Sequence, residues 1–136
     1  MDLSYIDANY WIYWFDERLP EHEHVDGTMQ KAIREGVVVS TVTLMEVAHY
    51  FRALQPGILI KTMKMITDLS TLILIDFNST IMSSSIGFLS TYSHVGLGSR
   101  DCVILATMKT VGSIDLLTHD KSFNKVKEIN VIDEIR

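Results

Sequence analysis

The 136-residue chain has one cysteine, two prolines and no long uninterrupted run of apolar residues. The lone Cys102 cannot form an internal disulfide, so a disulfide-stapled fold and a cysteine-built metal site are excluded and a reducing compartment is expected. No segment approaches the roughly 18 consecutive apolar residues of a membrane span. Asp2 stands where a secretory signal peptide carries basic residues. We therefore expect a cytoplasmic protein without a membrane segment, in which Cys102 is a small core residue.

Positive charge is also scarce. Twelve lysines and arginines face seventeen acidic residues, which gives a formal net charge of −5. Proteins that coat nucleic acid through bulk electrostatics are usually basic, so this balance disfavours a simple DNA- or RNA-coating role. An enzyme whose acidic site is neutralised by a metal ion is not excluded.

What the chain does contain is the composition of a folded globule, with 47% hydrophobic and 21% charged residues. Its length predicts a single domain over residues 1–136. Strands are expected at residues 3–6, 37–41, 72–75, 114–118 and 131–132. Helices are expected at residues 8–16, 26–35 with Gly36 as C-cap, about 44–54, about 58–69, 79–93, and from just after Ser99 as N-cap; Pro20 and residues 21–24 are expected in a loop. Apolar strands alternating with helices predict a three-layer α/β/α sandwich around a mostly parallel sheet of about five strands.

Four acidic residues fall at one edge of this predicted sheet. Asp7 and Asp120 follow strands, Asp101 lies in the first turn of a helix, and Glu46 is expected in the first turn of the helix after the second strand. The carboxyl ends of parallel strands and the helices that follow them share one edge, where ligands bind. Each acid alone also suits a cap or a turn, and the pattern around Glu46 fits a capping box.

Together the four carboxylates are harder to explain as caps, because crowded like charges raise one another's pKa and destabilise the fold. A divalent cation would resolve that conflict. Oxygen ligands without a cysteine or histidine cluster favour Mg²⁺ or Mn²⁺ over zinc.

Four motifs resemble those of PIN-domain nucleases, in the same order and over nearly the whole chain: YIDAN at 5–9, TLMEV at 43–47, SRDCVILA at 99–106 and LTHDKSF at 117–123. The small single-domain form is most similar to VapC-type toxins of type II toxin–antitoxin modules. The resemblance implies metal-dependent RNA cleavage, with ligands and supporting polar residues at these positions: Asp7, Glu46, Asp101 and Asp120 as Mg²⁺ or Mn²⁺ ligands, and Asn9 and Thr118 as supports. Ser122 stands where many relatives have another Asp, so the number of metals stays open.

The chemistry expected of such a site is hydrolysis of a phosphodiester by a water whose pKa the metal lowers. A local basic rim could hold the RNA backbone despite the acidic total, with Arg100 and Lys121 as the contact candidates. Lys125 and Lys127 fit the same rim or a solvated helix face. The resemblance further implies a homodimer and an antitoxin whose tail occupies the active-site groove.

For that groove, the helices within residues 44–69 are a candidate wall, with Leu59, Met63 and Ile66 available if exposed. The aromatic residues at 10–15 are expected in the core or in a dimer interface rather than stacked on bases. The histidines are not assigned to the catalytic group: His22 and His24 fit solvated surface, and His49 and His119 fit structural positions.

Three other functions compete with the toxin. A phosphoacceptor signalling domain would use Asp76 at the end of the third strand, but it also needs an acidic pair after the first strand and a lysine after the last one. The chain has only Asp7 and the sequence NVID at 130–133 at those two places. A non-catalytic PIN-like module that binds RNA or protein, and an RNA-processing nuclease outside a toxin module, are the remaining alternatives.

Overall fold

The computed structural model describes residues 2–136 and is built on one five-stranded sheet. The strands are β1 (Ser4–Ile6), β2 (Val37–Ser40), β3 (Leu72–Ile75), β4 (Asp115–Leu117) and β5 (Asn130–Ile132). They run in the order β3-β2-β1-β4-β5, and each neighbouring pair is parallel. The prediction of a mostly parallel sheet of about five strands is confirmed.

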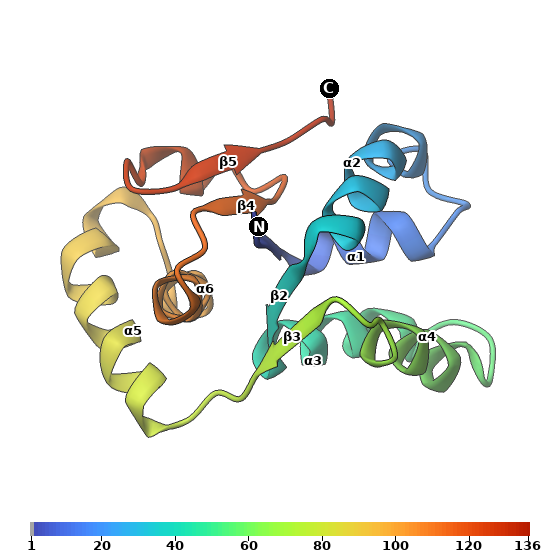
Figure 1. Cartoon of the computed structure of the whole chain (residues 1–136), viewed down its shortest axis with the longest axis horizontal. Helices are drawn as coiled ribbons and strands as arrows, with labels where there is room; N and C mark the ends of the chain where they lie inside the picture. Colours follow the sequence, from blue (N-terminus) through green and yellow to red (C-terminus); the bar gives the residue numbers. More distant parts are fainter. Residues whose placement is uncertain (1) are drawn as a thin grey trace.

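Within residues 2–136, six helices cover this sheet from two sides. They are α1 (Ala8–Phe15), α2 (His22–Glu35), α3 (Thr41–Phe51), α4 (Ile58–Thr67), α5 (Ser79–Tyr92) and α6 (Ser99–Val111); the 3₁₀ turns are η1 (Ser93–Val95) and η2 (Lys121–Lys125). Figure 1 shows α5 and α6, yellow to orange, on one side of the strands and α1 to α4 on the other. The three-layer α/β/α architecture is therefore confirmed. Across residues 2–136, every helix is too short or too polar to span a bilayer.

The core lies around the two central strands. Every residue of β1 and β2 is buried, which agrees with the apolar, β-branched composition of strands covered on both faces. Trp11 of α1 is fully buried, and its indole N–H donates to the Ile6 carbonyl at 3.1 Å. Cys102 is fully buried on α6, as expected of a small core residue.

The strand order reverses beside β1, and this places the site. The chain passes from β1 to β2 and β3 on one side, and then returns to β4 on the other side of β1. The Asp7 N–H donates to the Leu117 carbonyl at 3.0 Å, just where both strands end. In open parallel sheets the crevice at such a reversal, beyond the carboxyl ends of the strands, is the usual ligand site.

The starts of β1, β4 and β5 differ from the sequence prediction by one residue, and those of α2 and α3 differ by more. Helix α2 begins at His22 rather than near residue 26, because its buried Val25 and Met29, one turn apart, hold the charged residues before them in helical register. The Gly36 C-cap of α2 is confirmed. Helix α3 begins at Thr41 because the Ser40 hydroxyl accepts a hydrogen bond from the Val42 N–H at 3.1 Å, which caps the helix and ends β2.

The N-cap of α6 also differs. It is Gly98, not Ser99, and the Asp101 carboxylate accepts the Gly98 N–H at 3.1 Å. Asp101 lies in the first turn of α6, as expected.

Candidate metal centre

Asp7 sits at the reversal of strand order with little exposure to solvent. It directly follows β1, is the N-cap of α1 and is 8% exposed. Its Oδ1 accepts the Ala8 N–H at 2.7 Å, and its Oδ2 accepts the Thr118 hydroxyl, also at 2.7 Å. Both oxygens are therefore fixed by donors from the two chain segments that leave β1 and β4.

Asn9 and Thr118, expected as supporting residues, tie these two segments together. The Asn9 amide donates to Thr118 Oγ1 at 3.4 Å and accepts the His119 N–H at 3.3 Å. Thr118 Oγ1 also accepts the Asp120 N–H at 3.0 Å. The turn that carries Asp120 is thus held against the turn that carries Asp7.

Asp120 is the N-cap of η2. Its Oδ1 accepts both the backbone N–H and the hydroxyl of Ser122, at 3.0 and 2.7 Å. Ser122, the position that departs from the resembled motif, orients this carboxylate rather than adding another one.

Glu46 comes from α3 and faces α6. The capping-box explanation of Glu46 is wrong, because α3 begins at Thr41 with Ser40 as its cap and Glu46 lies in the second turn, not the first. The Glu46 carboxylate instead accepts the Arg100 guanidinium in an ion pair, with Arg100 next to Asp101 on α6. On the same helix, Thr43 Oγ1 contacts the buried Tyr5 hydroxyl at 2.6 Å, which fixes the start of α3 against β1.

These side chains line one hollow. A cavity of about 200 Å³ is bordered by all four predicted acids, Asp7, Glu46, Asp101 and Asp120, together with Asn9 and Arg100. In the conformation of residues 2–136, no three acidic, histidine or cysteine side chains stand close enough to hold one metal ion. A cation would therefore enter only with rotation of side chains, of which Glu46, Asp101 and Asp120 are only partly buried.

The donor set fits a hard divalent cation. Its four carboxylates, with an amide and a hydroxyl beside them, offer only oxygen among the strong ligands, which suits Mg²⁺ or Mn²⁺. Burial raises the pKa of Asp7, the hydrogen bonds from Thr118 and Ala8 lower it, and the charges of Asp101 and Asp120 raise it further. Burial likewise raises the pKa of Glu46 and of Asp101. The fold thus holds ionised carboxylates at positions where water stabilises them poorly. A bound cation would offset this unfavourable desolvation.

A second polar cluster beside the site was missed in the sequence. Asp133, which follows β5, accepts Lys121 Nζ, His119 Nδ1 and the Tyr10 hydroxyl at 2.8, 2.8 and 2.9 Å. Although burial raises the pKa of Asp133, the hydrogen bonds from Lys121 and His119 outweigh it and lower this pKa to about 2. The available signal was its place after a strand, which is the same signal that identified Asp120. Lys121, an RNA-contact candidate, is therefore paired with a carboxylate.

The groove predicted within residues 44–69 needs a correction. Ile66 is fully buried in the core, and Leu59 and Met63 are partly buried against it, because these residues form the inner face of α4. A separate hollow of about 490 Å³, which shares no lining residue with the acidic hollow, lies between α4 and the first two helices. Its border includes Trp14, His22, Asp26, Lys61 and Met65. Tyr10 and Trp11 are fully buried, so for these two the expected core packing is confirmed.

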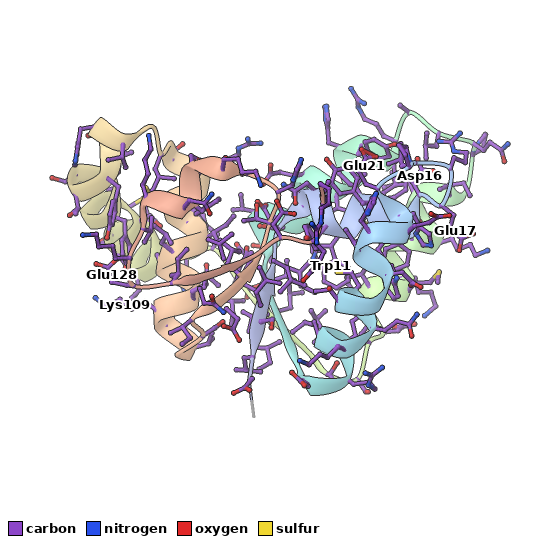
Figure 2. All side chains as sticks on the ribbon, turned by 90° about the horizontal axis from the view of Figure 1, so that it is seen from above. Trp11, Asp16, Glu17, Glu21, Lys109 and Glu128 are labelled. Carbon is purple, nitrogen blue, oxygen red and sulfur yellow. The ribbon has the colours of Figure 1, made fainter. Side chains whose placement is uncertain are left out.

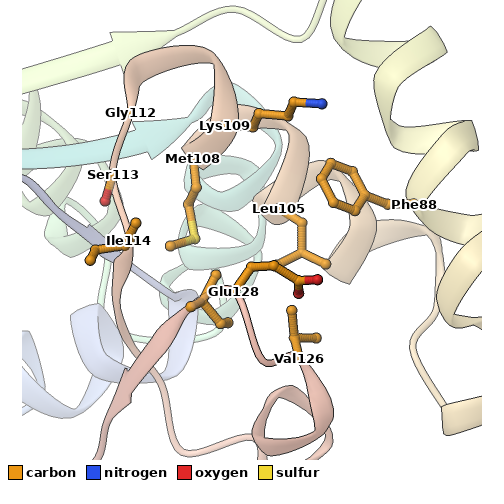
Figure 3. A pocket seen from close by; sticks show the side chains of 10 residues that line it. Phe88, Leu105, Met108, Lys109, Gly112, Ser113, Ile114, Val126 and Glu128 are labelled. Atoms are coloured by element: carbon orange, nitrogen blue, oxygen red, sulfur yellow. The ribbon is translucent and has the colours of Figure 1, made fainter.

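The acidic hollow is not the largest on the molecule. A cavity of about 500 Å³, lined by Phe88, Leu105 and Met108 among others, has Lys109 and Glu128 as its charged residues (Figure 3). It shares no residue with the acidic hollow. Figure 2 shows Lys109 and Glu128 at one end of the molecule and Asp16, Glu17 and Glu21 at the other. The four acids that could bind a cation all line the smaller, acidic hollow.

Comparison with known proteins gives the family and the fold. Residues 4–129 match the family model of the PIN domain. No curated protein sequence matches the chain. The structure is similar to VapC20 of Mycobacterium tuberculosis, a sarcin-ricin loop cleaving toxin, with a TM-score of 0.78, 11% identity and coverage of 91% of this chain and 95% of that one.

Two toxin–antitoxin structures show the same likeness. For VapBC2 of Rickettsia felis bound to a promoter DNA fragment, the TM-score is 0.72 and the identity 15%, with 96% and 98% of the two chains covered. For a toxin–antitoxin complex of Klebsiella pneumoniae, the TM-score is 0.66 and the identity 21%, with 95% of each chain covered. At these identities the likeness is one of fold.

Proposed function

The chain belongs to the PIN domain family, and we propose that it is a metal-dependent ribonuclease, the toxin of a VapBC-type toxin–antitoxin pair. Its membership confirms the resemblance that the four motifs indicate. The observation that carries the proposal is the hollow at the reversal of strand order, which four carboxylates from four separate segments line together. Caps and turns explain single acids, but not the convergence of four.

We propose that these four carboxylates are the ligands of Mg²⁺ or Mn²⁺: Asp7, Glu46, Asp101 and Asp120. A bound divalent cation supplies Lewis-acid stabilisation of charge on the phosphoryl oxygens and lowers the pKa of the attacking water. The donors from Thr118 and Ala8 keep Asp7 oriented, the Gly98 N–H does so for Asp101, and Ser122 for Asp120.

An ionised carboxylate of the cluster accepts the proton of the attacking water. The water oxygen then bonds to phosphorus as the bond from phosphorus to a ribose oxygen breaks, and the departing ribose oxygen takes a proton from solvent water. Arg100 and Lys121, which flank the cluster on α6 and η2, are the proposed contacts to the RNA backbone.

Two partners complete the proposal. Several structures of similar fold are toxin–antitoxin complexes, which supports an antitoxin partner for this chain. The hollow of about 490 Å³ beside α4 offers that partner aromatic, apolar and charged side chains. We also propose a homodimer. Edge strand β3 exposes Ile73 and Leu74, and α5 exposes Met82 and Ile86 one turn apart, so these apolar side chains are available to a second copy.

The decisive experiment is RNA cleavage by the purified protein. We expect single-stranded RNA to be cut in Mg²⁺ or Mn²⁺ and not after addition of a chelator. Mutation of a residue that only hydrogen-bonds to a metal ligand typically lowers activity by roughly 10- to 100-fold. Asp7→Asn and Asp101→Asn each remove a proposed ligand, so they should lower the cleavage rate by more than this, with unchanged circular dichroism. Asp68→Asn, an equal charge change at the exposed end of α4, is the matched control. Undiminished cleavage by both variants would overturn the proposal.

The toxin role has its own test. Expression of the chain in the cytoplasm should arrest growth, and co-expression of a small reading frame immediately upstream of its gene should relieve the arrest. Cleavage without growth arrest would instead favour an RNA-processing nuclease.

A further inference from the structure

The ion pair between Arg100 and Glu46 crosses the acidic hollow from α6 to α3. Nη1 of Arg100 donates to Oε2 of Glu46. The Arg100 side chain is 68% exposed, whereas that of Glu46 is 25% exposed. The guanidinium can therefore leave this position without loss of core packing, but Glu46 stays at the hollow.

The charges around the hollow are strongly unequal. Within the part of the chain that the structure describes, four acidic residues line it and Arg100 is the one basic residue among its lining. The guanidinium thus serves as the counter-charge of the cluster in the protein without metal. It does so beside two of the proposed ligands, since it pairs with Glu46 and directly precedes Asp101.

A divalent cation and Arg100 make conflicting demands on Glu46. The cation and the guanidinium are both positive, so they repel each other at the few ångströms that separate two groups bound to one carboxylate. In residues 2–136, no three candidate ligands are close enough to hold an ion together. Binding therefore requires rearrangement, and Glu46 is the one acid of the four that is restrained by a cation rather than by neutral donors.

We propose that Arg100 is a positioning residue that holds Glu46 in the metal-free protein and competes with the divalent cation for it. This inference rests on the proposed function, since it presupposes that the cluster binds a metal. Arg100 then weakens metal binding, and it becomes available to the RNA backbone once the cation has displaced it. A purely structural role predicts the opposite, because loss of a strut between α3 and α6 would loosen the ligands.

The test is the affinity of the full chain for Mn²⁺, measured by isothermal titration calorimetry without RNA. Arg100→Met and Arg100→Gln should each lower the dissociation constant by about three- to tenfold, because one nearby positive charge is removed. Lys109→Met is the matched control. It removes the same charge from an exposed position on the same helix, roughly 14 Å further along its axis, and should change the dissociation constant by less than about twofold.

A second readout follows the metal-free protein. In a chelator, Arg100→Met should lower the thermal midpoint, and saturating Mn²⁺ should remove most of this difference. Affinity for Mn²⁺ that is unchanged or weaker in both Arg100 variants overturns the competition while leaving the metal site intact. Absence of Mn²⁺ binding by the unmodified chain overturns the proposed function, and this inference with it.

Discussion

Thr118 Oγ1 donates a 2.7 Å hydrogen bond to Asp7 Oδ2, although the two residues are 111 positions apart in the sequence. The bond joins the carboxyl ends of β1 and β4, the two strands between which the strand order reverses. The same hydroxyl accepts the Asp120 N–H. One side chain therefore sets the relative positions of two acids of the proposed metal centre.

Thr118→Val tests this arrangement. The substitution keeps the shape of the side chain but leaves a buried carboxylate with one donor fewer, which should cost about 1–3 kcal/mol in the free energy of unfolding. Because Asp7 and Asp120 both lose an orienting contact, RNA cleavage should fall by about 10- to 100-fold. Denaturant unfolding and initial cleavage rates measure the two effects.

Thr107→Val is the matched control for this variant. Thr107 is also fully buried, but its hydroxyl donates at 2.8 Å to the Val103 carbonyl of its own helix. Loss of that bond should cost less than about 1 kcal/mol, since the carbonyl remains in the helix ladder, and cleavage should be unchanged. Equal effects of the two substitutions would show that Thr118 is only a packing residue.

The pKa shifts of the cluster predict how metal stabilisation depends on pH. Burial raises the pKa of Asp7, Glu46 and Asp101 in the folded chain. Their contribution to stability is therefore fully present below their unfolded pKa values and is lost as the pH rises through the folded values. At neutral pH the ionised cluster destabilises the metal-free fold, and a cation should offset this.

We accordingly expect Mn²⁺ at about 100 times its dissociation constant to raise the thermal midpoint by about 5–10 °C at neutral pH. The increase should shrink as the pH falls through the folded pKa values, because protonated carboxyls are poor ligands. Differential scanning calorimetry over a pH series measures this. An equal increase in Asp7→Asn would place the binding site elsewhere.

The sheet was predictable because its signal is local. Continuous β-branched and apolar runs such as Val37–Ser40 indicate strands covered on both faces, and the rule for parallel strand ends then places Asp7 and Asp120 at one edge. The same signal misleads at β3. Its apolar residues resemble those of a central strand, but the strand lies at the edge and exposes Ile73 and Leu74.

The pairing of the site residues was not predictable in this way. Which carboxylate meets Arg100, or that Asp133 accepts three side-chain donors, depends on distances between segments that are separated in the sequence. The start of α2 at His22 was missed for a related reason. The charged residues before Val25 suit a loop, but they adopt helical structure because Val25 and Met29 anchor the helix to the core. Local propensity gives the elements, and tertiary packing decides their ends and contacts.

Ser122 offers a test of how Asp120 is oriented. Ser122→Ala removes the 2.7 Å hydrogen bond from the hydroxyl to Asp120 Oδ1 but keeps the backbone N–H. We expect cleavage to fall by up to about tenfold, with a change in the free energy of unfolding below about 1 kcal/mol. Ser122→Thr restores the hydroxyl and should restore the rate. Failure of threonine to rescue would mean that the hydroxyl is not what orients Asp120.

Asp133 pairs with Lys121, the proposed contact to RNA, and we expect this pairing to limit the positive charge that Lys121 offers. The Asp133 carboxylate binds Lys121 and His119, and its pKa of about 2 lies below the ordinary value of 3.8. A lowered carboxyl pKa contributes stability that is present above the unfolded value and is lost as the pH falls through the folded one. Asp133→Asn should therefore be less stable than the unmodified chain by about 1–3 kcal/mol at neutral pH, and the difference should disappear between pH 3.8 and about 2.

The same substitution frees a cation, so binding and stability should change in opposite directions. In a chelator, where RNA stays intact, Asp133→Asn should bind single-stranded RNA a few-fold more tightly by fluorescence anisotropy, because Lys121 no longer has a competing carboxylate. Asp115→Asn makes the same charge change at the other end of the sheet, where its partner is Asn130, and separates this local effect from net charge. If both variants gain equally, net charge explains the binding. If Asp133→Asn alone gains, Lys121 is the contact that Asp133 restrains.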